Sequence, residues 1–321
     1  MSRYTLSETI KLYEEVGNRN GDFLFNWIKN IYDFFYLPSI DLNFKEVLAL
    51  DKTKLTIFDV LVDDLADNCK LRNRELLEKA IRIPWNGTKT YNNKYLDITQ
   101  QIWVDCIKSI RQYPKYNEFK DIFYFDLDKT LSSMKYSFLI NQAGFDNIVE
   151  DEIYIQHGVM AILHADLDLM CSPGFNYEEL KKLRPILHWV QNIVHIGNLM
   201  NTFAREVEEA DFSSPILSFA FRERIIDKQM ILDKPEQALN KLKQLVPYFK
   251  EKAEDNFQKI KFCADAIESI DIHDYYRKLR KVWNEFLERK QYWKPTLVVE
   301  EKRPVIISKP LIALSIPWVR M

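Results

Sequence analysis

Apolar residues recur at spacings of three and four through most of the chain, which is the period of an amphipathic α-helix. Glycine and proline stand mostly between such stretches or near their ends, as they do at helix boundaries. No internal repeat and no linker interrupts residues 1–292. The pattern therefore predicts an all-α fold, a single-domain bundle of about ten to twelve helices. The predicted helical segments are 22–36, 53–70, 96–111, 119–142, 151–171, 176–209, 213–231 and 235–290.

The pattern changes after Trp293. Residues 293–321 contain four of the 12 prolines and two short β-branched runs. This composition does not continue a helix. We therefore expect a helical domain at 1–292 and a Pro-rich C-terminal extension at 293–321, either draped over the bundle in extended form or disordered.

Composition limits the class of protein. Only 7 of the 321 residues are glycine, about 2% where ordinary usage is ~7%, which disfavours folds built on glycine-rich turns, such as dinucleotide-binding loops and β-propellers. Hydrophobic residues make up 47% and aromatic residues 13%, enough for a large core. The 45 Lys and Arg against 47 Asp and Glu leave a net charge of −2. This balance argues against a nucleic-acid partner, which phosphate electrostatics would require.

The cysteines and the apolar runs bear on the compartment. Cys69, Cys106, Cys171 and Cys263 are far apart, and no pair has C-x-x-C spacing, so neither a zinc site nor a disulfide framework is indicated. The N-terminus lacks an apolar signal core, and no run reaches the ~18 apolar residues of a membrane span. We expect a cytoplasmic protein without a membrane span.

Three aspartates follow the mostly apolar stretch 57–62. Asp63 and Asp67 are four residues apart, one turn of a helix, and Asp64 stands between them. Two unpaired carboxylates at this spacing repel each other unless a cation lies between them. Carboxylate oxygens, completed by water and substrate phosphates, are the usual protein ligands of Mg²⁺. The alternative is a solvated acidic helix face.

A second polar stripe follows at 198–206. Asn198, Thr202 and Glu206 succeed one another at intervals of four, so they share one helix face. An amide oxygen, a hydroxyl and a carboxylate are hard donors that suit Mg²⁺. Arg205 directly precedes the glutamate and offers a forked donor to a phosphate oxygen. Alone, this stripe could be an ordinary polar helix face; paired with the aspartates, it predicts a two-sided metal clamp for one anion.

The two motifs together resemble those of the class I terpene synthases of the microbial type. Asp63, Asp64 and Asp67 match that family's D-D-x-x-D motif. The second motif, N-D-x-x-S-x-x-x-E, is matched at 198–206 with Thr in place of Ser and Leu in place of Asp. The resemblance implies that Asp63, Asp67, Asn198, Thr202 and Glu206 hold three Mg²⁺ ions, and that Arg205 contacts diphosphate.

The resemblance is incomplete in the C-terminal third and upstream of the second motif. The family carries an Arg-Tyr pair after a tryptophan; Arg289 fits the arginine after Trp283, whereas Tyr292 lies two positions late, behind Lys290. The family's diphosphate-sensing arginine has no counterpart between Arg111 and Arg184. Its candidate replacements are Lys135, His157 and His164.

The resemblance implies a carbon–oxygen lyase that ionises a linear prenyl diphosphate, releases diphosphate and cyclises the carbocation to a terpene. Segments 136–141 and 168–173 look like those of bacterial diterpene cyclases, so geranylgeranyl diphosphate is the favoured substrate and farnesyl diphosphate the second. A homodimer is plausible for this class. Aromatic faces can stabilise a cation. The candidate cavity aromatics are Phe35, Phe58, Trp189, Phe203 and Trp283.

Three other interpretations stay open. Residues 126–130 have the D-x-D-x-T form of haloacid-dehalogenase-like phosphatases, with Asp126 and Asp128 as the acids, although that chemistry needs a β-strand where the pattern predicts a helix. A prenyl-chain-elongating enzyme would carry a second aspartate-rich motif at 198–206. A non-enzymatic helical binding module would use both motifs as solvated stripes.

Overall fold

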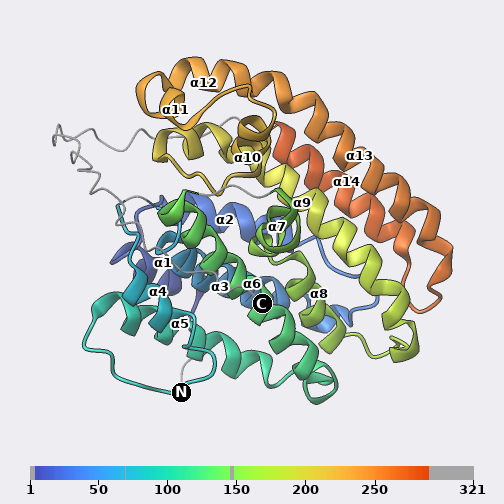
Figure 1. Cartoon of the computed structure of the whole chain (residues 1–321). Helices are drawn as coiled ribbons and strands as arrows, with labels where there is room; N and C mark the ends of the chain where they lie inside the picture. The colour runs from blue at the N-terminus through green and yellow to red at the C-terminus, as the bar shows by residue number, and fades with distance from the viewer. Residues whose placement is uncertain (1–3, 69, 145–147, 289–321) are drawn as a thin grey trace, which may run out of the picture. The chain divides into compact units, whose positions relative to one another are not determined.

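Helices account for the regular structure in the part of the chain that the computed structural model describes, residues 4–68, 70–144 and 148–288 (Figure 1). No strand occurs within these residues, which confirms the predicted all-α fold. The α-helices are α1 (Leu6–Glu14), α2 (Gly21–Tyr32), α3 (Lys45–Asp64), α4 (Arg74–Ala80), α5 (Lys94–Ile110), α6 (Tyr116–Ala143), α7 (Ile148–Tyr154), α8 (Ala161–Met170), α9 (Leu180–Glu209), α10 (Pro215–Arg222), α11 (Lys228–Asp233), α12 (Pro235–Leu242), α13 (Val246–Cys263) and α14 (Ile272–Glu288). Short 3₁₀ segments are η1 (Leu42–Phe44), η2 (Ile155–Val159), η3 (Tyr177–Glu179), η4 (Lys243–Leu245) and η5 (Ala264–Ala266).

Local side chains set many helix starts. At α1, Thr5 accepts a hydrogen bond from the Glu8 backbone and the Glu8 side chain accepts one from the Thr5 backbone, a capping box. Asparagines at the starts of α2, α4 and α5 accept from the third residue of each helix. Gly144, with φ 70°, ends α6 in the left-handed region that glycine adopts without strain.

Helix boundaries differ from the prediction where apolar periodicity runs across a break. The segment 151–171 divides into α7, η2 and α8 because Met160 adopts φ 55° between them. Short helices of this kind are why the described residues contain α1 to α14 rather than the ten to twelve expected. Helix α3 begins at Lys45, earlier than the predicted start at 53. Its first half carries buried charged residues, among them Lys52 and Lys54, which the apolar pattern does not count.

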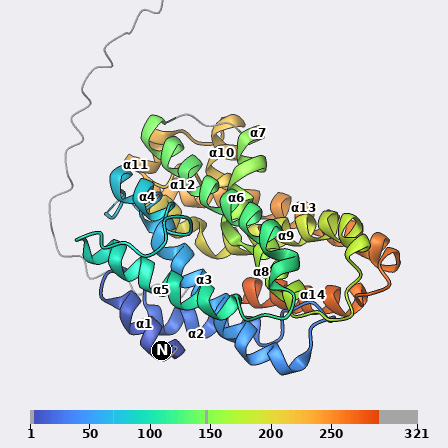
Figure 2. The same ribbon diagram turned by 90° about the horizontal axis from the view of Figure 1, so that it is seen from below.

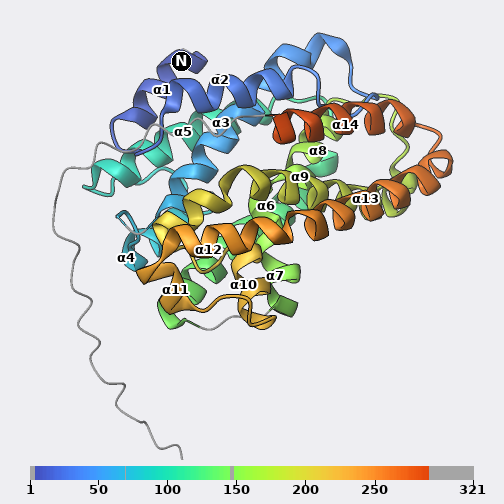
Figure 3. The ribbon, with the colours of Figure 1, turned by 90° about the horizontal axis from the view of Figure 1, so that it is seen from above.

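Two groups of helices stand out in the compact unit 1–290 (Figure 2). In Figure 2, α1, α2, α3 and α5 gather on one side and α8, α9, α13 and α14 on the other. Helix α3 packs against α5, α2 and α1, while α9 packs against α13 and α14 and runs alongside α13 in Figure 3. Helix α8 contacts α3, α6 and α9, and so connects the two groups. The predicted extension 293–321 lies outside the described residues.

The structure bears on two expectations, one about membrane-spanning helices and one about the cysteines. None of the described helices is long and apolar enough to span a membrane. Cys106 and Cys171 are buried and Cys263 is half-buried, and no disulfide joins these three cysteines; Cys69 lies outside the described residues.

Candidate functional site

The three aspartates of the first motif lie where α3 ends. The helix ends at Asp64. Asp67 therefore lies in the following turn, whereas the sequence pattern predicted that it would lie on the helix. The amide of Asp67 nevertheless donates to the carbonyl of Asp63 at 3.0 Å, which keeps Asp67 one turn above Asp63. The Arg72 side chain holds this turn by donating to the carbonyls of Ala66 and Asp67, at 3.1 and 2.8 Å.

Burial and mutual repulsion disfavour the ionised form of the carboxylates at this end of α3. Burial raises the pKa of Asp67 well above its ordinary value, and the charges of Asp63 and Asp211 raise it further. Burial also raises the pKa of Asp63. Asp59 Oδ1, Asp64 Oδ2 and Asp67 Oδ1 are buried without a hydrogen-bond partner. Buried carboxylate oxygens that the protein leaves unpaired are what a cation would satisfy.

An arginine from the segment between α1 and α2 reaches these aspartates. Arg19 Nε and Nη2 donate to Asp64 Oδ1 at 3.0 and 2.6 Å, and Nη2 lies 3.5 Å from Asp63 Oδ2. Asp64 is fully buried, whereas the Asp63 side chain keeps 32% of its surface accessible. Arg19 was not a sequence-predicted site residue, because it lies far from both motifs in the chain and no local pattern marks it.

The second motif lies on α9, as predicted, with a gradient of burial along the helix. Asn198 is exposed, Thr202 is half-buried and Glu206 is buried. Thr202 Oγ1 donates to the Asn198 carbonyl at 3.0 Å. Gly197, directly before the motif, lets the Phe286 ring of α14 pack on the backbone, since a Cβ there would lie 2.5 Å from the ring.

Glu206 is the most constrained member of the second motif. Ser214 Oγ, just before α10, donates to Glu206 Oε2 at 2.5 Å. Burial, and then the nearby charge of Asp211, raise the pKa of Glu206 to about 7. Arg205 Nη1 lies 3.4 Å from Glu209 Oε2, and its charge lowers the pKa of Glu206 against these effects.

Arg205 and Asp211 join the two motifs electrostatically. Each acts on the pKa of Asp63, Asp67 and Glu206, so the end of α3 and the C-terminal part of α9 face one charged region. Asp211 follows α9 and is held by Asn141 Nδ2, which donates to Asp211 Oδ1 at 2.7 Å. Asp211 was missed in the sequence because it lies in a turn outside both motifs. Only its place directly after an acidic helix end signals it.

The donors at this region fit a hard divalent cation in kind. They are carboxylate, hydroxyl and amide oxygens, which Mg²⁺ prefers, and three of the buried aspartate oxygens have no hydrogen-bond partner. Among the described residues, no three His, Cys, Asp or Glu side chains are arranged to hold a metal by themselves. Ligands from water and from a substrate anion would therefore have to complete such a site, as they usually do for Mg²⁺.

Other predicted anion-binding residues have different surroundings. Arg289 and Tyr292 lie outside the described residues. Of the candidate sensors, Lys135 is exposed on α6, His157 Nδ1 lies 3.0 Å from Gln191 Nε2, and His164 is buried. Within the part of the chain that the structure describes, none of these three side chains forms a hydrogen bond or an ion pair with the acidic residues of the two motifs.

Four of the five predicted cavity aromatics are core residues in this structure. Phe35 stacks on Tyr275, with ring centroids 5.2 Å apart. Phe58 packs against a tryptophan of α5, and Trp283 against a phenylalanine of α13. Phe203 is 6% exposed on α9. Their burial is compatible with either a core or a cavity role.

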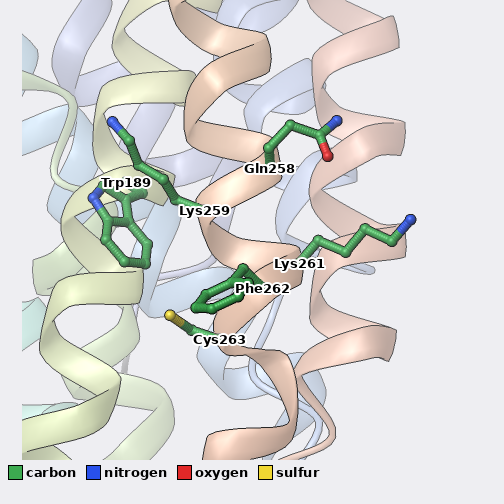
Figure 4. A pocket seen from close by; sticks show the side chains of 6 residues that line it. All are labelled: Trp189, Gln258, Lys259, Lys261, Phe262 and Cys263. Carbon is green, nitrogen blue, oxygen red and sulfur yellow. The ribbon is translucent and has the colours of Figure 1, made fainter.

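Trp189 differs from the other aromatics. It lines an open pocket of about 630 Å³ with residues of α13 (Figure 4). At ~100° per residue, nine residues place Trp189 on the face of α9 opposite Asn198. This position does not bring it to the acidic residues. The other lining residues are Gln258, Lys259, Lys261, Phe262 and Cys263.

The D-x-D-x-T string lies inside helix α6, not at the end of a strand. Asp126 accepts two hydrogen bonds from Arg184, at 2.5 and 2.9 Å, while Asp128 is exposed. Thr130 Oγ1 donates to the backbone carbonyls of Asp126 and His157. An aspartate in a helix and in a two-pronged ion pair is not the exposed nucleophile at a strand end that phosphatase chemistry needs.

Comparison with solved structures identifies the fold. The chain is similar to linalool/nerolidol synthase from Streptomyces clavuligerus, solved in complex with 2-fluorogeranyl diphosphate, with a TM-score of 0.57 and 13% sequence identity. The match covers 89% of this chain and 99% of that chain. No family model and no curated protein matches the sequence. The chain therefore has the all-α fold of a terpene synthase.

Proposed function

We propose that this protein is a Mg²⁺-dependent class I terpene cyclase. The observation that carries the proposal is the cluster of carboxylates at the end of α3, which has buried oxygens without a hydrogen-bond partner and feels the charge of Arg205 on α9. An enzyme that removes diphosphate from an allylic carbon needs both cation ligands and basic side chains at one place. The similarity of the fold to that of a terpene synthase supports the proposal.

The roles of the residues follow from their donors and their surroundings. Asp63 and Asp67 would hold metal from one side, and Asn198, Thr202 and Glu206 from the other, with three ions in all. When bound, Mg²⁺ supplies a Lewis acid that stabilises the charge of the leaving diphosphate.

Arg205 has its guanidinium beside the acids and would bind a diphosphate oxygen. Arg289 and Tyr292 are proposed to bind the same group.

The proposed substrate is a linear prenyl diphosphate, geranylgeranyl diphosphate first and farnesyl diphosphate second. The similar structure was solved with a prenyl diphosphate analogue, 2-fluorogeranyl diphosphate. A carbocation reacts with water, so the interior must keep water from the chain while aromatic faces stabilise the charge. Phe35, Phe58, Phe203 and Trp283 are the aromatics that we propose for this role. We also propose a cytoplasmic location and a homodimer.

Product analysis tests the proposal directly. The purified protein is incubated with Mg²⁺ and geranyl, farnesyl or geranylgeranyl diphosphate, and the organic extract is analysed by mass spectrometry. We expect a cyclic terpene from at least one substrate. Folded protein that yields no terpene from any of the three would reject the cyclase and favour a binding module.

Matched variants test the residues. Asp63→Ala and Glu206→Ala should each abolish turnover and keep helical circular dichroism. Asp128→Ala, an exposed aspartate of α6, should keep full turnover. Full activity in either of the first two variants would remove that residue from the metal site. Hydrolysis of p-nitrophenyl phosphate by the wild type but not by Asp126→Ala would support the phosphatase instead.

A further inference from the structure

Arg19 lies between the acidic residues without belonging to either motif. Its guanidinium is anchored on one oxygen of Asp64 through Nε and Nη2. The same Nη2 lies 3.5 Å from Asp63 Oδ2, the oxygen of an aspartate that is partly accessible. Its charge also opposes the rise that burial causes in the pKa of Asp67 and of Glu209 on α9. Arg19 therefore lies beside Asp63 and Asp64 of α3 and acts electrostatically on an acid of α9.

The backbone around Arg19 is built to hold this position. The Arg19 amide donates to the Tyr13 hydroxyl at 3.2 Å. The Tyr13 ring lies against Phe25, with centroids 4.8 Å apart, and is fully buried. Gly17 packs directly on the same ring, and a Cβ there would lie 2.3 Å from it. The turn from α1 to α2 is thus fitted to Tyr13, and this fit fixes where the Arg19 side chain begins.

One end of the guanidinium has no partner among the described residues. Nε and Nη2 make all the contacts of this group, so both N–H groups of Nη1 remain available. The side chain keeps 22% of its surface accessible. A guanidinium held at one edge presents its other donors in a fixed direction, and these donors match the oxygens of a phosphate.

We propose that Arg19 is a diphosphate-binding residue and that Asp64 positions it through Oδ1. The inference rests on the proposed function, because it assigns Arg19 to the anion of the same substrate. The α1–α2 turn thereby becomes a third side of the site, in addition to α3 and α9. Arg19 and Arg205 would bind the diphosphate, while Asp63 and Asp67 hold the cations that accompany it.

The competing explanation is that Arg19 only neutralises Asp64, which is fully buried. Arg19→Lys separates the two. Lysine keeps the positive charge near Asp64 but lacks the planar fork, so it can neutralise the aspartate without presenting a second edge to a phosphate. A purely structural role predicts normal anion binding in this variant.

Binding of inorganic diphosphate in the presence of Mg²⁺, followed by calorimetry, tests the proposal without turnover. We expect Arg19→Lys and Arg19→Gln to weaken binding by roughly 10-fold or more, the loss of a hydrogen bond to a charged group. Asp64→Asn should weaken it as well, because the anchor of the guanidinium is lost. The matched control is Arg74→Gln, an exposed arginine of α4 paired with Glu78, which should bind as the wild type does.

Tyr13→Phe provides a variant that preserves packing if the Arg19 variants fold poorly. It keeps the buried ring and removes only the hydroxyl that accepts the Arg19 amide. We expect weaker diphosphate binding with an unchanged circular dichroism spectrum. Wild-type affinity in both Arg19→Lys and Tyr13→Phe overturns the role of Arg19 and leaves the proposed function standing. Absence of Mg²⁺-dependent diphosphate binding in the wild type overturns both.

Discussion

The hydroxyl of Ser214 donates a hydrogen bond of 2.5 Å to Oε2 of Glu206. Ser214 occupies the N-cap position of α10, yet its side chain makes no capping hydrogen bond with that helix. It serves the glutamate of α9 instead. If Glu206 holds metal as proposed, a hydrogen-bond partner that orients it in this way should support metal affinity.

Ser214→Ala should therefore weaken the site without unfolding α10. We expect the Mg²⁺ concentration for half-maximal turnover to rise by roughly 10- to 100-fold, the usual cost of losing such a partner. The control is Ser218→Ala on α10, whose hydroxyl is buried without a partner. Equal Mg²⁺ dependence in the two variants would show that the hydrogen bond does not support metal binding.

Gly197→Ala should destabilise the contact between α9 and α14. The added Cβ would lie 2.5 Å from the Phe286 ring, which has to move. Such overpacking costs about 1–3 kcal/mol of unfolding free energy, measurable by urea denaturation. Adding Phe286→Leu should restore part of the loss, because a smaller side chain leaves room for the methyl group. No gain in the double variant would mean that another contact limits this position.

Arg184→Leu should be strongly destabilising. It leaves Asp126, which is 2% exposed, without its partner and close to the buried Asp166. Removing one member of a buried ion pair typically costs about 3–5 kcal/mol, again read from urea denaturation. Replacing Asp126 by leucine as well should recover most of this loss, since no unpaired charge remains. A small effect of Arg184→Leu would show that water or Lys129, 3.9 Å from Asp126, compensates the charge.

His157 makes stability depend on pH. Burial, and then the charges of Lys129 and His188, lower the pKa of His157 to about 4 from its ordinary 6.5. Between these values the unfolded chain binds a proton that the folded chain does not, so the unfolding free energy falls as the pH falls. The contribution is about 3 kcal/mol over the whole window.

The measurement compares denaturation at pH 7 and pH 5 for the wild type and His157→Gln. The variant should lose less stability than the wild type on acidification, because its amide does not titrate. A slope that is the same in the wild type and the variant would assign the pH dependence to other groups.

The sequence was sufficient where the physics is local. Helix period, N-terminal caps and the glycine that ends α6 act over a few residues, so the all-α fold and most segments could be predicted from them. The polar spacing of Asn198, Thr202 and Glu206 also lies within one helix. The end of α3 was less predictable. The amide of Asp67 keeps a helical hydrogen bond to Asp63, so the spacing of the two aspartates is the same whether Asp67 lies on the helix or in the turn after it.

The tertiary structure alone decided which charges meet. Arg19 comes from the α1–α2 connection, and Asp211 and Ser214 come from the α9–α10 connection. Nothing in the local sequence of Arg19 or Ser214 points to Asp64 or Glu206, and Asp211 is marked only by its place after an acidic helix end. The tertiary structure also places Trp189 beside residues of α13, although tryptophan is a residue type that suits a cavity. Helical periodicity states which residues share a face. Which face of another helix this face packs against depends on contacts between segments distant in sequence. Those contacts form only when the whole bundle packs.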